Sequence, residues 1–145
     1  MHVGGAEDTK KIRLDSFVQE FKEKRLKAQS KQLETNCKKV LQAMGKVFVK
    51  KDPLLKNTGI VVVYFLLFYQ AAKVRKVGLL TRSKFLKFDD IRNKNRELAE
   101  VDIEKADYDL IRFEELANSL NDKFAIKFRY DTICKYVLPQ LAVKD

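Results

Sequence analysis

The sequence predicts an all-α domain, and three observations lead to that prediction. Glycine (5) and proline (2) are scarce among the 145 residues, which disfavours sandwiches and barrels that need many tight turns. Apolar residues recur at helical spacing between residues 33 and 48. One apolar run, 60–69, is too short to span a bilayer and suits the centre of a helical core. We therefore expect a compact domain of five to seven helices, with a buried central helix near 60–72.

The beginning of the chain separates into a lead-in and a first helix. Residues 1–11 combine glycine and charge without periodicity, so we expect a disordered lead-in followed by one helical domain over 12–145. A helix is expected from Leu14, because Ser16 and Gln19 match a capping box. Its apolar stripe consists of Phe17, Val18 and Phe21.

The clearest helical stripe follows. Its apolar residues lie on one face of a helix about four turns long. They are Leu33, Cys37, Val40, Leu41, Met44, Val47 and Phe48. Lysines lie mostly on the other side. The pair Asp52-Pro53 then indicates a new helical start, because aspartate caps helices and proline suits the first helical position.

The run from Ile60 to Tyr69 has two interpretations. Three consecutive valines favour a strand by propensity. A buried helix that continues to Ala72 is the rival, supported by the helical segments around it and by the lack of partner strands. We predict the helix.

The next segments are a connector and two further helices. Residues 73–82 are expected to turn at Gly78. The connector is expected to bury its four apolar side chains, Val74, Val77, Leu79 and Leu80. Ser83 is expected to cap a helix that carries Phe85 and Phe88, and an acidic helical segment is expected over 101–120.

The last part of the chain contains the best strand candidate. Aromatic and apolar residues alternate with others between residues 124 and 130. Because no partner strand is evident, we expect an extended or irregular segment that packs its aromatic side chains inward. Asp131 or Thr132 is expected to cap a final helix, which Pro139 ends or kinks.

Residues that catalysis or metal binding would need are scarce. The single histidine, His2, lies in the lead-in, so a serine or cysteine nucleophile lacks an internal histidine base. Cys37 and Cys134 have neither the spacing of a zinc site nor that of a disulfide framework. No glycine-rich phosphate loop or dinucleotide fingerprint occurs. We expect a non-enzymatic protein without cofactor, metal or small-molecule substrate, and no membrane span.

Charge is distributed unevenly along the chain, whose net charge is +10. Residues 1–88 hold 20 Lys/Arg and 7 Asp/Glu, whereas residues 89–145 hold 10 and 13. This asymmetry indicates two kinds of partner surface. Six cations with no acid between them form the candidate nucleic-acid-binding set: Lys73, Arg75, Lys76, Arg82, Lys84 and Lys87. Such a cluster attracts phosphate by counterion release, although a solvated face or a contact with an acidic partner helix are alternatives.

Four segments in one order resemble a known family. They are RLDSFVQEFKEKRL (13–26), the glycine-led run ending YFLLFYQ (64–70), KVRKVGLLTRSKF (73–85) and DKFAIKFRY (122–130). Together they resemble the N-terminal helical domain of subunit 1 of the small-nuclear-RNA-activating protein complex, over about residues 12–142. The chain departs from the family at Val61, Val62 and Val63, where leucine and tyrosine are favoured, and at Phe85, where tryptophan is expected.

The resemblance implies a role in transcription. This protein would be a non-catalytic scaffold subunit of a nuclear complex that binds the proximal promoter element of small nuclear RNA genes, for RNA polymerases II and III. Partner subunits with Myb-type repeats would read the sequence, and this subunit would contact DNA as part of the complex. Two other classes stay open: a stand-alone basic helical nucleic-acid-binding protein, and a peripheral membrane adaptor whose basic half meets acidic lipid.

Overall fold

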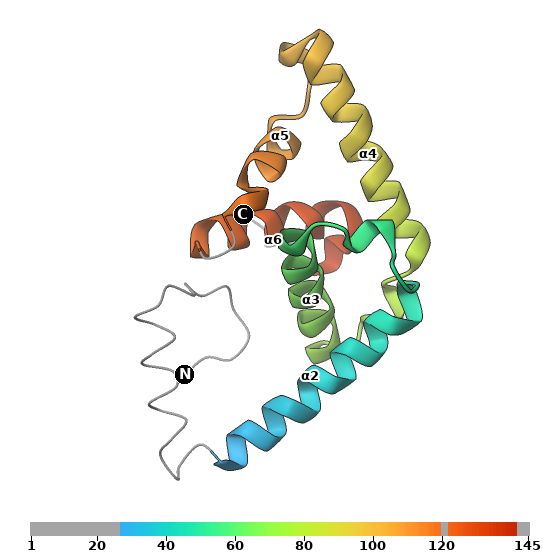
Figure 1. The fold of residues 1–145 in the computed structure, drawn as a ribbon, viewed down its shortest axis with the longest axis vertical. Helices are drawn as coiled ribbons and strands as arrows, with labels where there is room; N and C mark the ends of the chain where they lie inside the picture. Colours follow the sequence, from blue (N-terminus) through green and yellow to red (C-terminus); the bar gives the residue numbers. More distant parts are fainter. Residues whose placement is uncertain (1–26, 120–121, 142–145) are drawn as a thin grey trace.

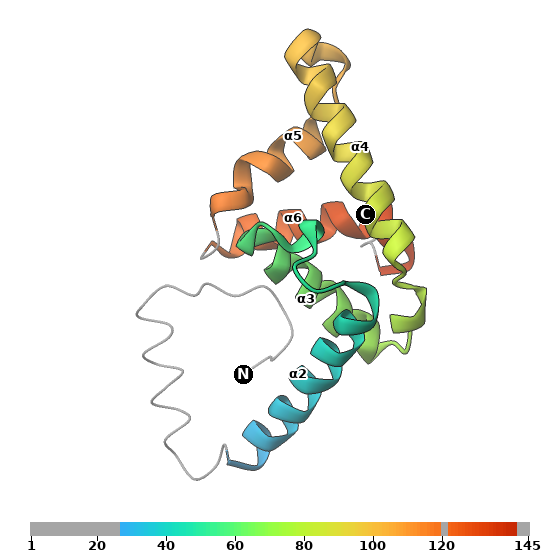
Figure 2. The same cartoon turned by 45° about the vertical axis from the view of Figure 1, so that its right-hand side comes forward.

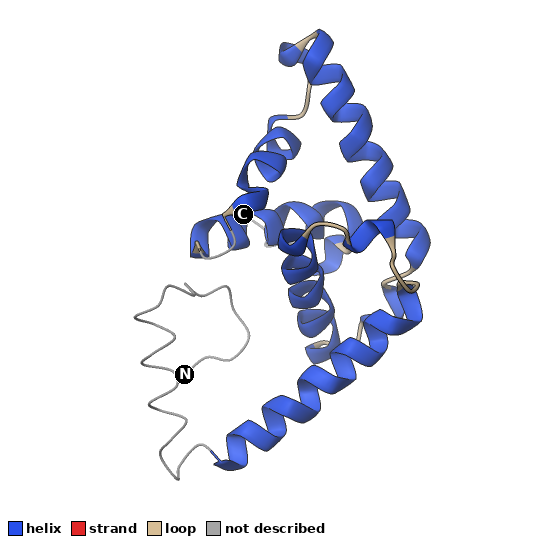
Figure 3. Ribbon diagram, viewed as in Figure 1, coloured by secondary structure: helices blue, strands red, loops and turns tan. Residues whose placement is uncertain are grey.

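The computed structural model describes residues 27–119 and 122–141, and within these ranges every regular element is helical (Figure 3). The α-helices are α2 (Lys27–Val47), α3 (Thr58–Lys73), α4 (Arg82–Val101), α5 (Tyr108–Glu115) and α6 (Lys123–Val137). Short 3₁₀ turns lie between and after them: η2 (Pro53–Leu55), η3 (Val77–Leu79), η4 (Ile103–Lys105), η5 (Leu116–Asn118) and η6 (Pro139–Leu141). The predicted all-α class is confirmed. The expected lead-in and first helix lie outside the described residues.

Helices α3 and α6 form the centre of the molecule. They pack against each other, and α4 and α5 both pack against α6 (Figures 1 and 2). Helix α2 packs against α3, while its N-terminal part extends away from the body. The end of α4 and the turn η4 form the apex of the drawn molecule, far from α2, and α5 follows below the apex. The start of α4 therefore lies beside the other helices, whereas its end lies at the apex of the molecule.

The central run folds as helix α3, not as a strand. The side chain of Asn57 caps it by accepting a hydrogen bond from the backbone N–H of Gly59 (2.8 Å). Eight residues of α3 are buried, which confirms the expected buried central helix: Gly59, Ile60, Val63, Tyr64, Leu67, Phe68, Tyr69 and Ala71. A helix satisfies its own backbone hydrogen bonds, so the run needs no partner strand in the core.

Aromatic rings join three helices in the core. The ring centroid of Phe48, just after α2, lies 5.5 Å from that of Tyr64 in α3 and 5.0 Å from that of Phe85 in α4. Tyr64 and Phe85 are 4.8 Å apart, and Phe68 completes the group. Each large ring buries far more apolar area than an aliphatic side chain, so this group fixes the positions of α2, α3 and α4.

The expectation of an irregular segment at 124–130 is wrong, because these residues are the first half of helix α6. Asp122 caps the helix by accepting a hydrogen bond from the N–H of Ala125 (2.8 Å). Asp131 and Thr132 are therefore interior residues and not caps. The helix ends at Val137, two residues before Pro139, as expected.

The connector between α3 and α4 also differs from the prediction. Leu80 is buried and Val77 is half-buried, but Val74 and Leu79 are 48% and 43% exposed. The chain reverses through Arg75, whose φ is 57°, and then through η3, so successive side chains do not share one inward face. Asp52 caps η2 with Pro53 at its first position, as predicted. Helix α4 begins after Thr81 instead of being capped by Ser83.

Candidate functional site

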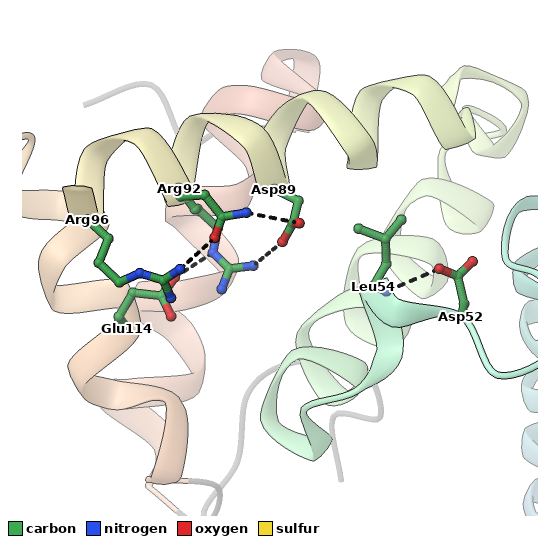
Figure 4. A network of polar contacts seen from close by, with 7 residues as sticks. Asp52, Leu54, Asp89, Arg92, Arg96 and Glu114 are labelled. Carbon is green, nitrogen blue, oxygen red and sulfur yellow. Dashed lines mark hydrogen bonds and ion pairs between the residues drawn. The ribbon is translucent and has the colours of Figure 1, made fainter. Parts of the chain in front are cut away.

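Arg82 does not belong to an open basic surface, because it binds Asp52. The Asp52 side chain is fully buried, and both terminal nitrogens of the Arg82 guanidinium donate to its carboxylate (Nη2–Oδ1 3.2 Å). The backbone N–H groups of Val49 and Leu54 donate to the same carboxylate (2.9 and 3.1 Å; Figure 4 shows the bond to Leu54). Arg82 Nη1 also donates to the carbonyl of Val47 (3.4 Å). These bonds hold the pKa of Asp52 at about 2, with the Arg82 hydrogen bond as the main cause.

Burial of Asp52 leaves a long stretch of the chain without an exposed acid. Between residues 46 and 87 the sequence has ten Lys/Arg and one acidic residue, Asp52. Because that one carboxylate is buried and paired, the exposed charge contributed by this stretch is entirely positive. A surface with one sign of charge attracts polyanions more strongly than a mixed surface.

The other five predicted cations lie around the connection from α3 to α4. Lys73 ends α3, and its ammonium group lies 4.9 Å from the centre of the Tyr69 ring. Arg75 and Lys76 follow in the turn, and Lys84 and Lys87 lie in the first turns of α4. Arg75, Lys76, Lys84 and Lys87 form no ion pair with any residue in 27–119 or 122–141. These four cations are therefore available to an anion.

The fold adds cations that the sequence analysis did not assign to the site. The bonds from Arg82 to Val47 and Asp52 bring the loop after α2 to the start of α4. Lys46, Lys50 and Lys51 are exposed in or beside that loop. The feature of the sequence that could have indicated these added cations is Asp52, because it is a single acidic residue among many cations. We call the set Lys46, Lys50, Lys51, Arg75, Lys76, Lys84 and Lys87 the basic end.

Apolar side chains are exposed within the basic end. They are Val49, Val74, Leu79 and Leu86, each between 43% and 56% exposed. Their positions in the sequence alternate with the cations of the basic end. Phosphate binding gives no role to these apolar side chains, because phosphate offers them only charged oxygen atoms.

A second polar cluster joins α4, α5 and α6, and sequence reasoning missed it. Arg92 Nε donates to Glu114 (2.5 Å) and Arg92 Nη1 to Asp89 (3.3 Å; Figure 4). The guanidinium carbons of Arg92 and Arg129 lie 5.2 and 4.7 Å from the centre of the Phe113 ring. The pairing of residues 92 and 114 depends on how α4 meets α5, which no local pattern in the sequence shows.

Arg129 is the least compensated charge in this cluster. It is 3% exposed, and burial lowers the pKa of its guanidinium to about 10. Within the described part of the chain, Arg129 Nε and the buried Tyr64 hydroxyl each lack a hydrogen-bond partner. The cation–π contact with Phe113 and the attraction to the Glu114 carboxylate both favour the charged guanidinium.

The described residues hold neither a metal-binding cluster nor a membrane-spanning helix. No group of three or more His, Cys, Asp or Glu residues in 27–119 and 122–141 is placed to hold a metal ion. Among the described helices, none has both the length and the apolar character to cross a membrane. Comparisons with protein-family models, curated proteins and solved structures find no match to this chain. The basic end is the candidate functional site.

Proposed function

We propose that this protein is a non-catalytic helical module that binds the phosphate backbone of nucleic acid through its basic end. The observation that carries the proposal is the burial of Asp52, which removes the one acid from a stretch with ten cations. Four of those cations, Arg75, Lys76, Lys84 and Lys87, are free of ion pairs with the described residues. Each phosphate that they neutralise releases condensed counterions, which favours binding.

The start of α4 adds to the attraction. Its first turn contains no acidic residue, and the Thr81 side chain makes no capping hydrogen bond to a backbone N–H. N–H groups at a helix start suit phosphate oxygens, and Lys84 follows within the same turn. The backbone and side chains here therefore favour the same kind of ligand.

A salt titration tests this proposal. Binding of a short DNA duplex is followed by fluorescence anisotropy for the wild type and for a variant with Arg75→Gln, Lys76→Gln, Lys84→Gln and Lys87→Gln. We expect affinity to fall about equally for unrelated duplex sequences, and the log–log salt slope to shrink by roughly one per phosphate contact removed. An unchanged slope would remove the basic end from nucleic-acid binding.

A matched control carries the same change in net charge elsewhere. Lys94, Lys105, Lys127 and Lys135 form ion pairs with Asp90, Asp102, Asp131 and Asp109 respectively. Replacing these four lysines by glutamine should leave the salt slope close to that of the wild type. Arg82 is kept in both variants, because removing it would leave the buried Asp52 carboxylate without its partner.

The resemblance described above gives the proposal a finer form. The protein would then be a scaffold subunit of a nuclear transcription complex on the proximal promoter element of small nuclear RNA genes, serving RNA polymerases II and III. Three of the four resembling segments lie in the described structure: 64–70 in α3, 73–85 across the connection to α4, and 122–130 at the start of α6. Their order and the all-helical fold support this form of the proposal.

The finer form has its own experiment. The chain is reconstituted with the other subunits of such a complex, and assembly and promoter binding are measured separately. The fourfold glutamine variant should assemble normally and bind the promoter more weakly. A loss of assembly would assign the basic end to a protein partner instead, and failure of the wild type to join the complex would reject the finer form alone.

A further inference from the structure

The far end of α4 carries a second surface, which we call the acidic tip. It comprises residues 97–108 at the end of α4, η4 and the start of α5, and it forms the apex of the molecule (Figures 1 and 2). Glu97, Glu100 and Glu104 are exposed there and form no ion pair with a described residue. Its exposed apolar side chains are Leu98, Val101, Ile103 and Tyr108, with Val101 at 87%.

Exposed apolar side chains are therefore concentrated in the segments that form the basic end and the acidic tip. Of the ten large hydrophobic side chains that are exposed in the described structure, four lie in the basic end and four in the acidic tip. Clustered exposed apolar groups rimmed by charge are typical of protein–protein contact surfaces. Positive charge surrounds the apolar side chains of the basic end, and negative charge surrounds those of the acidic tip. The two surfaces are therefore complementary in charge, and both offer apolar contacts.

The two surfaces of one molecule cannot meet each other. Helix α4 has 20 residues, so its ends lie about 30 Å apart at 1.5 Å per residue. A contact between a basic end and an acidic tip must therefore join two molecules. We propose that the acidic tip of one molecule docks on the basic end of a second copy, in a head-to-tail contact.

Charge and apolar content both support this occupant. The free cations Arg75, Lys76, Lys84 and Lys87 would face Glu97, Glu100 and Glu104 of the second copy, and exposed apolar side chains occur in the same segments as the charges on both sides. Opposite potentials speed association and fix the orientation of the two surfaces. A head-to-tail contact leaves one free end on each molecule, so it forms chains or rings and not a closed two-fold dimer.

The contact would also regulate the proposed function. The acidic tip and nucleic-acid phosphate require the same cations, so duplex DNA should compete with a second copy for the basic end. This regulatory part rests on the proposed function. Self-association itself does not, because it is measured without nucleic acid.

Sedimentation of the full chain at low salt tests the contact with two variants. The tip variant carries Glu100→Gln, Val101→Ser and Glu104→Gln, and the basic-end variant carries Lys84→Gln, Leu86→Ser and Lys87→Gln. Val101, Leu86 and the four charged groups are half-buried or exposed, so the fold should tolerate these changes. We expect each variant alone to associate at least about tenfold more weakly than the wild type.

An equimolar mixture of the two variants gives the decisive result. The tip variant keeps an intact basic end, and the basic-end variant keeps an intact tip, so the mixture should form a one-to-one dimer and nothing larger. A control with Leu41→Ser and Phe124→Ser, which are exposed apolar residues outside both surfaces, should associate like the wild type. Added DNA should convert wild-type chains to monomers.

Three outcomes would overturn the head-to-tail contact. They are a wild type that stays monomeric at low salt, variants that associate like the wild type, and a mixture that fails to form the dimer. Binding of the wild type to anionic lipid vesicles, lost with Leu79→Ser and Leu86→Ser, together with a monomeric state in solution, would assign the apolar groups to a membrane. Intact self-association with an unchanged DNA salt slope would instead remove only the proposed function.

Discussion

Asp52 and Arg82, which are thirty residues apart in the sequence, form an ion pair whose carboxylate is completely buried. The pair joins the loop after α2 to the first residue of α4. Because the same carboxylate caps η2 and accepts from Val49, one side chain fixes three backbone segments. The pair therefore both shapes the basic end and removes from the surface the one acidic side chain of residues 46–87.

Asp52→Asn should lower the free energy of unfolding by about 2 kcal/mol at neutral pH, because the amide loses the charge-assisted bonds to Arg82. The folded-state pKa of Asp52 is about 2, below its ordinary 3.8. The stabilisation is thus fully present above about pH 4 and is lost as the pH falls towards 2. Urea unfolding of wild type and variant at several pH values measures this.

The difference in the free energy of unfolding between the wild type and Asp52→Asn should shrink as the pH is lowered from about 4 towards 2. Asp90→Asn is the control, because Asp90 forms an exposed pair with Lys94 and should contribute little. A gap between wild type and Asp52→Asn that stays constant down to pH 2.5 would contradict the role of this pair.

The depth of α3 in the core predicts different costs for two neighbouring valines. Val63 is 1% exposed, whereas Val62 is half-buried. Val63→Asp places a carboxylate without a partner in the core, so it should lower the free energy of unfolding by about 4 kcal/mol or prevent folding. Val62→Asp should lower the free energy of unfolding by less, about 1–2 kcal/mol. Thermal melts of both variants check the order, and Val63→Ala provides a milder variant if Val63→Asp fails to fold. Equal costs would mean that α3 is rotated about its axis.

Because the Arg129 guanidinium is buried, an apolar residue of similar size should replace Arg129 without loss of stability. Arg129→Met should leave the free energy of unfolding unchanged or raise it by about 1 kcal/mol, because the desolvated and incompletely bonded charge is removed while the side-chain volume is kept. Arg92→Met is the comparison. It leaves Glu114 and Asp89 without their partner and should lower the free energy of unfolding by about 1 kcal/mol. A large loss of stability in Arg129→Met would show that its contact with Phe113 outweighs its burial.

The backbone at Arg75 predicts a gain of stability combined with a loss of binding. Its φ of 57° lies in the left-handed region that favours glycine. Arg75→Gly should therefore raise the free energy of unfolding by about 0.5 kcal/mol, after the entropy cost of glycine is subtracted. Arg75→Ala should give no such gain. Both variants should weaken DNA binding equally in the anisotropy assay, and unequal weakening would show that the backbone change, not the lost charge, is responsible.

Helix positions were predictable where the sequence pattern acts locally. The helix that carries the stripe and the start at Asp52-Pro53 were both expected and both form, but Leu41, which was placed on the apolar face of the stripe, is 58% exposed. The central run was assigned correctly because its neighbours are helical. The alternation at 124–130 led to the wrong prediction of an extended segment with inward aromatic side chains. In α6, Phe124 is 58% exposed and Arg129 is buried. An aromatic residue on the surface and a cation in the core reverse the usual order of burial.

The candidate site was predictable only in part, for the same reason. Arg75, Lys76, Lys84 and Lys87 could be selected from their sign and spacing. That Arg82 is structural depends on Asp52, and that Lys50 and Lys51 join the site depends on the same pair. The sequence also does not show that Val74 and Leu79 are exposed, because an apolar side chain in a connector is usually buried. Contacts between distant segments decide each of these points.

The charges at the two ends of α4 are opposite to those that its macrodipole favours. A helix is favoured by acidic groups near its start and basic groups near its end, each worth about 0.3–1 kcal/mol. Helix α4 has the opposite arrangement, with Lys84 in its first turn beside Arg82, which Asp52 pairs, and with Glu97 and Glu100 close to its end. Its first turn contains no acidic residue and its last turn no basic residue. Added salt screens this repulsion, so salt should make the fold more stable while it weakens contacts with polyanions. The same arrangement adds the positive helix terminus to the cations of the basic end, which strengthens the field that an approaching anion meets.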